Sequence, residues 1–298
     1  MSATTKQTAD VELEPGRPTS RSGRRPWALI ALLTPLILVA VLAVVAPWLP
    51  VPDPNAQELR YRLAPPVWQT DGTWAHPLGT DHLGRDMLSR LLHGARLTFL
   101  IAISAMAAGA TFGTFMGMLA GYKRGWVDTV ISRVIDAQLA LPVILLALAV
   151  IAARGRSIGV LVFVLAIISW AQYARIIRSE TLTLRERPFV LGLRAGGVPT
   201  WRILLRHILP NVGGTVLVLA TLEVGAMILA ESALSFLGLG VVSPGISWGA
   251  MLAEGRDHIT QAWWVITLPG LAITAVVLTI NLLGDVLRLR YDPRKRRY

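Results

Sequence analysis

The sequence contains no cysteine, and only 16% of its 298 residues are charged. The lack of cysteine excludes disulfides, thiolate metal sites and a cysteine nucleophile. The scarcity of charge excludes an ordinary soluble domain, in which about a quarter of the residues are charged. Instead, 53% of the residues are hydrophobic and the mean hydropathy is +0.54. These values predict an all-α polytopic membrane protein, because helices satisfy their backbone polar groups internally.

Catalytic and nucleotide-binding motifs are also absent. No G-x-x-x-x-G-K-[ST], G-x-S-x-G or H-E-x-x-H occurs in the chain. The sequence therefore offers no phosphate-binding loop of that type and no familiar hydrolase or metalloprotease site. The histidines and aspartates between His76 and His93 have no standard metal-ligand spacing. We expect a chain that is not an enzyme and binds no metal or cofactor of its own.

Six hydrophobic stretches are long enough to cross about 30 Å of hydrocarbon as helices. They are residues 27–49, 97–120, 131–153, 157–174, 212–232 and 263–284. Pro142 lies inside the third stretch and predicts a kink there. With the N-terminus inside, cytoplasmic Lys and Arg outnumber outer ones 21 to 8, so both termini are predicted to be cytoplasmic. This placement explains the net charge of +11 without a nucleic-acid partner.

The spans divide the chain into four parts. A polar cytoplasmic tail (1–26) precedes the first span and its extracytoplasmic segment (27–96). A five-helix core (97–287) follows, and a basic tail (288–298) ends the chain. The extracytoplasmic segment contains an apolar stripe that predicts an amphipathic helix on the membrane surface, formed by Leu83, Met87, Leu88, Leu91 and Leu92. A second extracytoplasmic loop spans residues 236–262.

Two sets of residues within the spans suggest packing or transport. The second span has a glycine at every fourth position, a pattern that lets another helix approach closely, at Gly109, Gly113, Gly117 and Gly121. The partner helix belongs either to this chain or to another subunit. Charged residues in spans are costly and often functional. We expect either internal ion pairs, such as Arg133 with Asp136, or a solute path lined by Asp136, Glu223 and Glu231.

A cytoplasmic segment of about 175–211 separates the fourth and fifth spans. The sequence predicts a helical extension of span four with a break near Pro188, a turn at Gly196-Gly197, and a short helix after Pro199. That helix has one apolar face, and Pro210 is expected to end it. The face consists of Trp201, Leu204, Leu205 and Ile208, with Arg202, Arg206 and His207 away from it. Such a hairpin either lies on anionic lipid or docks on a cytoplasmic partner.

Gly197 followed by Leu209-Pro210-Asn211 resembles the cytoplasmic signature of ABC importer permeases. That signature reads Glu-Ala-Ala, three residues, Gly, nine residues, Ile, one residue, Leu-Pro. The segments "HPLGTDHLGRDMLSRLLHGAR", "AGYKRGWVD", "ILAESALSFLGLG", "SWGAMLAEGRD" and "NLLGDVLRLRYDPR" are similar to the C-type permeases of dipeptide, oligopeptide and nickel importers. Two positions depart from the signature, because Leu191 stands in place of its Glu and His207 in place of its Ile.

The resemblance implies a type I ABC importer permease fold and a set of partners. These are a homologous B-type permease, two ATP-binding cassette subunits that hold ATP and Mg, a solute-binding protein outside, and membrane lipid. It makes the hairpin the ATPase-coupling element, through Leu191, Arg194, Gly197, Trp201, Arg202, Leu205, His207, Leu209 and Pro210. Short peptides are the expected cargo, with nickel or another small solute as the alternative. A stand-alone secondary transporter would show repeated halves, and no clear repeat is present.

Overall fold

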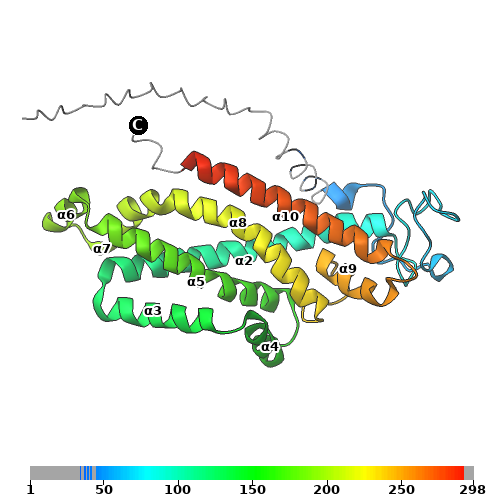
Figure 1. Cartoon of the computed structure of the whole chain (residues 1–298), viewed down its shortest axis with the longest axis horizontal. Helices are drawn as coiled ribbons and strands as arrows, with labels where there is room; N and C mark the ends of the chain where they lie inside the picture. Colours follow the sequence, from blue (N-terminus) through cyan, green and yellow to red (C-terminus); the bar gives the residue numbers. More distant parts are fainter. Residues whose placement is uncertain (1–33, 35–36, 38, 40, 42–44, 292–298) are drawn as a thin grey trace, which may run out of the picture.

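The computed structural model describes residues 45–291 and, before them, residues 34, 37, 39 and 41. Within these residues the chain is helical, and the only β pairing is an isolated bridge between Thr80 and Asp86. The long helices α2, α5, α8 and α10 run roughly along one axis (Figure 1). Helices α6 and α7 lie at one end of this axis, while α9 and the segment 50–86 lie at the other. The predicted all-α membrane fold is confirmed.

Helix α2 (Met87–Lys123) begins within the stripe that predicted a separate surface helix. That prediction is wrong, because residues 87–123 form one continuous helix. The Asp86 side chain caps the helix by accepting a hydrogen bond from the Ser89 backbone N–H at 2.7 Å. Met87 and Arg90, in its first turn, are almost fully buried within the chain. Of the stripe, Met87 lies in the main core and Leu91 packs against that core, while the other three leucines are half-buried.

The third predicted span is divided into α3 (Gly125–Ala140) and α4 (Val143–Arg154), which meet at 96°. Pro142 lies at this break, where it lacks the N–H that a continuous helix would need. The predicted kink is thus confirmed as a complete interruption. Within the residues that the structure describes, four helices are long and apolar enough to cross a membrane, or five if the bent pair forms one span. The predicted first span, 27–49, falls largely outside the described residues, so the expected six spans are not all visible.

The glycines of α2 pack against α5 (Ile158–Arg185) in the same chain. A side chain at Gly113 would collide with the Trp170 carbonyl, and one at Gly117 would lie 2.6 Å from the Ala174 carbonyl. Gly109 and Gly121 meet α5 in the same manner, and α2 and α5 form the most extensive helix contact in the structure. The stripe therefore serves packing within this subunit.

The remaining long helices are α8 (Leu209–Phe236) and α10 (Trp264–Tyr291), which pack against each other and enclose the core with α2. Short helix α9 (Trp248–Gly255) lies in the predicted outer loop and packs on both. Its Trp248 and Met251 are buried in the main apolar core. The loop 236–262 is therefore an integral part of the outer end of the bundle.

Candidate functional site

The cytoplasmic segment forms the predicted hairpin. Helix α6 (Pro188–Ala195) follows α5 after a two-residue break, and α7 (Thr200–Ile203) follows the glycine turn. Gly197 has φ +74°, a conformation that side chains disfavour, and the Val198 N–H donates to the Leu193 carbonyl at 3.1 Å. The break near Pro188, the turn at Gly196-Gly197 and the helix start after Pro199 are all confirmed.

The apolar face of the second arm is divided between the protein interior and the surface. Leu204 and Ile208 are buried in a small core that also holds Ile203 of α7. In contrast, Trp201 is 60% exposed and Leu205 is 51% exposed. Across the hairpin, Leu191 of α6 is 43% exposed. One row of apolar side chains thus fixes the hairpin to the bundle, while another faces outward.

The hairpin's second arm does not end at Pro210. A π-helical turn, Leu204–Ile208, joins α7 directly to α8, so one helix runs from Thr200 to Phe236. The Leu209 N–H bonds the Leu204 carbonyl five residues back. This wider turn accommodates the proline ring, which would clash with the carbonyl four residues back in a regular helix. The expectation that Pro210 ends the helix is wrong.

Polar side chains flank the exposed apolar row. The Arg202 guanidinium carbon lies 5.4 Å from the centre of the Trp201 ring, and Arg202 itself is exposed. Arg194 is exposed on α6, and His207 is half-buried in the π-helical turn. The Asn211 side-chain amide donates to the His207 carbonyl at 2.6 Å. The exposed end of the hairpin therefore combines apolar surface with positive charge.

The charged residues of the spans have different environments. Asp136 pairs with Arg175 of α5 at 2.9 Å, and not with Arg133 as expected, and both partners are more than half exposed. Glu223 is half-buried on α8. Glu231 is fully buried and accepts hydrogen bonds from the Ser235 and Ser247 hydroxyls, each at 2.7 Å. In this conformation Glu231 joins α8 to the start of α9 and faces no open path.

The role of Ser247 was not predicted from the sequence. Its hydroxyl also caps α9 by accepting from the Ala250 N–H at 3.1 Å. A serine directly before a short apolar helix is a capping signal. Its link to Glu231 depends on how the intervening loop folds, which the sequence does not reveal.

An ion-pair network holds the outer end together. Arg85 and Arg90 both contact Asp81 and Glu254. Burial alone would raise the pKa of Asp81, but Arg90, Arg85 and two backbone N–H groups together lower that pKa below its ordinary value. Ligand atoms of Asp81, His82 and Glu254 lie within 4.8 Å of one another, but the arginines already engage both carboxylates. The cluster is a structural network between residues 81–90 and α9.

Known proteins resemble this chain in both sequence and fold. Residues 109–297 match the family described as binding-protein-dependent transport system inner membrane component. The di/tripeptide transport system permease protein DppC of Pseudomonas aeruginosa is 43% identical over 259 residues, which cover 87% of this chain and 86% of that protein. The glutathione transport system permease protein GsiD of Pectobacterium atrosepticum is 43% identical over 220 residues, covering 74% of this chain and 73% of that protein.

Among solved structures, a chain of the inward-facing MetNI methionine ABC transporter is similar in fold. The TM-score is 0.56 at 17% identity, and the match covers 68% of this chain and 97% of the other. This likeness bears on the fold alone, and it agrees with the expected type I ABC importer permease architecture. Together with the apolar helices and the sequence matches, it identifies the chain as a multi-pass bacterial inner membrane protein of the binding-protein-dependent transport system inner membrane component family.

Proposed function

We propose that this chain forms part of the translocation path of an ATP-driven importer for short peptides. The observation that carries the proposal is the hairpin, which presents exposed Leu191, Trp201 and Leu205 at the end of the bundle opposite α9. Exposed apolar side chains of this kind mark a binding surface. Relatives named as di/tripeptide and glutathione permeases support peptide cargo.

The proposed assembly contains a homologous B-type permease beside this chain and two ATP-binding cassette subunits below it. A solute-binding protein delivers cargo to the outer end, near the loop 236–262. ATP and Mg bind in the cassette subunits, since this chain lacks a phosphate-binding loop. The hairpin docks on a cassette subunit through shape and apolar contact, because Leu191 replaces the acidic residue of the family signature.

The continuous helix from Thr200 to Phe236 provides a route by which docking at the hairpin would displace the membrane-spanning part of α8. Its 37 residues span about 55 Å at 1.5 Å per residue. A displacement at Trp201 is therefore transmitted to α8, and through Glu231 and Ser247 to α9. ATP binding and hydrolysis in the partners would shift such a bundle between inward-open and outward-open states.

The solute path is proposed to involve Asp136 and Glu223. Asp136 and its partner Arg175 are both more than half exposed, and Glu223 is half-buried on α8. Glu231 takes a different role in the described conformation, since its side chain is buried and its Oε1 accepts hydrogen bonds from two serine hydroxyls. We assign it to anchoring α9 on α8.

Co-purification tests the assembly. Tagged full-length chain extracted from its native membrane should retain a protein that carries G-x-x-x-x-G-K-[ST], identified by mass spectrometry. Trp201→Asp places a charge in the exposed apolar row and should reduce this retention at least about tenfold, which corresponds to losing about 1.4 kcal/mol of binding free energy. Retention of no such protein by the wild type would contradict the proposal.

A further inference from the structure

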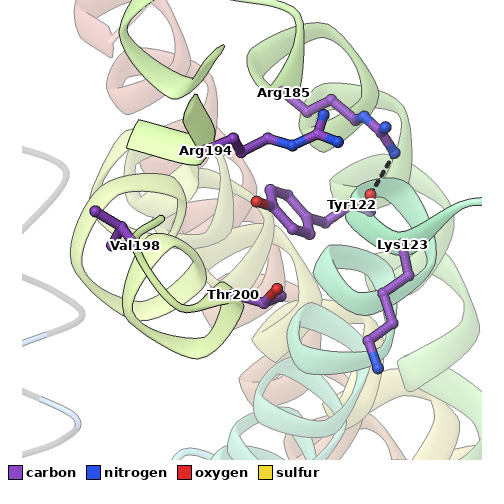
Figure 2. A pocket seen from close by; sticks show the side chains of 6 residues that line it. All are labelled: Tyr122, Lys123, Arg185, Arg194, Val198 and Thr200. Carbon is purple, nitrogen blue, oxygen red and sulfur yellow. Dashed lines mark hydrogen bonds between the residues drawn. The ribbon is translucent and has the colours of Figure 1, made fainter. Parts of the chain in front are cut away.

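A cavity of about 350 Å³ lies between the hairpin and the bundle. It is bounded by the last residues of α2 and α5, by α6 and by the turn before α7. The lining side chains are Tyr122, Lys123, Arg185, Arg194, Val198 and Thr200. Figure 2 shows the guanidinium groups of Arg185 and Arg194 on one side of the Tyr122 ring and Lys123 on the other. Three cations from three separate elements therefore border one space.

The positive charge of this cavity is only partly compensated. Arg185 donates a hydrogen bond to the Tyr122 carbonyl, and its Nε lies 3.5 Å from the Glu186 carboxylate. Glu186 is half exposed and is shared with Arg124 at 3.4 Å. Within the described chain, neither Lys123 nor Arg194 forms an ion pair. Like charges that face one cavity repel each other, so an anion bound there would be stabilised.

The lining groups match the chemistry of a phosphate group. The two guanidinium groups offer forked N–H donors that suit phosphate oxygens, and the Lys123 ammonium adds a further charge. The hydroxyls of Tyr122 and Thr200 also line the space and can donate hydrogen bonds. The volume exceeds that of one phosphate group, which leaves room for the substituents of a phosphodiester.

The position of the cavity favours a ligand at the membrane surface. Tyr122 and Lys123 are the last residues of α2 and follow directly after its apolar part. Basic pockets at the cytoplasmic side of membrane helices are suited to anionic lipid headgroups. We propose that this cavity binds a phosphate group, carried either by an anionic phospholipid or by free phosphate, and that the bound group braces the hairpin against α2.

The brace has a mechanical consequence. Lys123 belongs to the bundle, whereas Arg194 and Thr200 belong to the hairpin, so an anion held between them would bridge the two. A hairpin movement that separates these groups would break the anion's contacts. Occupancy therefore favours the described hairpin position and makes coupling sensitive to the phosphate-bearing ligand. This inference does not depend on the cargo or on the ATPase partners.

The test measures binding to the purified full-length complex without ATP. Native mass spectrometry compares retained phosphatidylglycerol with phosphatidylcholine, and a separate titration uses inorganic phosphate. Lys123→Gln and Arg194→Gln remove single cavity cations, and Arg206→Gln removes an exposed cytoplasmic cation outside the cavity. Each cavity variant should weaken binding about fivefold and the double variant about 25-fold, while Arg206→Gln binds as the wild type does.

The two probes separate the two sources of phosphate. Selective retention of phosphatidylglycerol that follows the variant pattern identifies a lipid headgroup. The same pattern with inorganic phosphate, and without lipid selectivity, identifies a free anion. Equal binding of both probes to all variants, or binding of neither probe, would overturn the proposal. Because no nucleotide is present, a failure here is distinct from a failure of ATPase docking.

Discussion

Single buried charges determine how firmly the outer end is held. Asp81 is 1% exposed and contacts two arginines, one of which, Arg90, is itself 2% exposed. Removing one member of such a group leaves another charge buried without its partner, which costs more than the ion pair alone contributes. The network connects residues 81–90 to α9 through Glu254. Its loss should therefore also destabilise the loop 236–262.

Asp81→Asn should therefore lower the free energy of unfolding by about 3–5 kcal/mol. Thermal unfolding of the purified protein, followed by tryptophan fluorescence, measures this change. Asp71→Asn is the matched control, because Asp71 is exposed and its φ of +69° suits asparagine. Equal midpoints for the two variants would contradict the role assigned to Asp81.

The same carboxylate predicts a pH dependence. The folded state lowers the pKa of Asp81 below its ordinary 3.8. Its stabilising contribution is therefore complete above pH 3.8 and is lost as the pH falls through the lowered folded-state pKa. Unfolding midpoints recorded across this acidic range should fall less steeply in Asp81→Asn than in the wild type. Parallel pH profiles would show that another group controls the acid response.

The close contact between α2 and α5 also depends on individual glycine residues. Gly113→Ala would place a methyl group against the Trp170 carbonyl, which requires α2 and α5 to separate. We expect a loss of about 1–3 kcal/mol in unfolding free energy, measured as a lower thermal midpoint. Gly159→Ala is the control, since it lies in α5 with open space around it and should be neutral or slightly stabilising. A midpoint unchanged by Gly113→Ala would contradict the close α2–α5 contact.

The sequence predicted some of these residue roles and not others. The four-residue spacing of Gly109 to Gly121 directly indicates a helix contact, but it does not say which helix is the partner. Pairing of Asp136 with Arg175, in place of Arg133, depends on how α3 lies against α5. The Glu231–Ser247 bond crosses a loop, so no helical periodicity reveals it.

Among the elements, the hairpin was predicted well at its turn and poorly at its second arm. Gly196, Gly197 and Pro199 have strong local preferences, and these determine where α6 ends and α7 begins. Pro210 was expected to end the arm, but the π-helical turn at Leu204–Ile208 removes the conflict. Leu204 and Ile208, at the two ends of that turn, are buried in the small core, and local sequence rules do not include such packing.

The turn provides an element-level prediction. Gly197→Ala requires alanine at φ +74°, which costs about 1–2 kcal/mol, although the surrounding space is open. Hydrogen exchange in residues 188–203 should become faster in this variant. Gly192→Ala, at a helical position in the same hairpin with open space around it, should leave exchange unchanged or slow it. Identical exchange in both variants would show that the turn does not depend on Gly197.

At the level of the whole molecule, composition alone predicted the membrane fold, and the lengths of the hydrophobic stretches predicted most of the spans. The division of the third span at 96° exceeded the expected kink, because a hydrophobic run does not show whether its two halves remain collinear. The prediction of a separate surface helix was wrong for a related reason, because an apolar stripe can pack against either a membrane surface or a protein core. The order of elements places the hairpin and α9 at opposite ends, joined by one continuous helix and its neighbours.

Uptake of a labelled dipeptide into vesicles that contain the complete complex tests the central claim most directly. Vesicles are supplied with the solute-binding protein outside and with or without ATP inside. Wild-type protein and Trp201→Phe should accumulate dipeptide only with ATP, whereas Trp201→Asp should lose at least about nine-tenths of this uptake while the bundle remains folded. Uptake that persists without ATP, or that is normal in Trp201→Asp, would contradict an ATP-driven importer coupled through the hairpin.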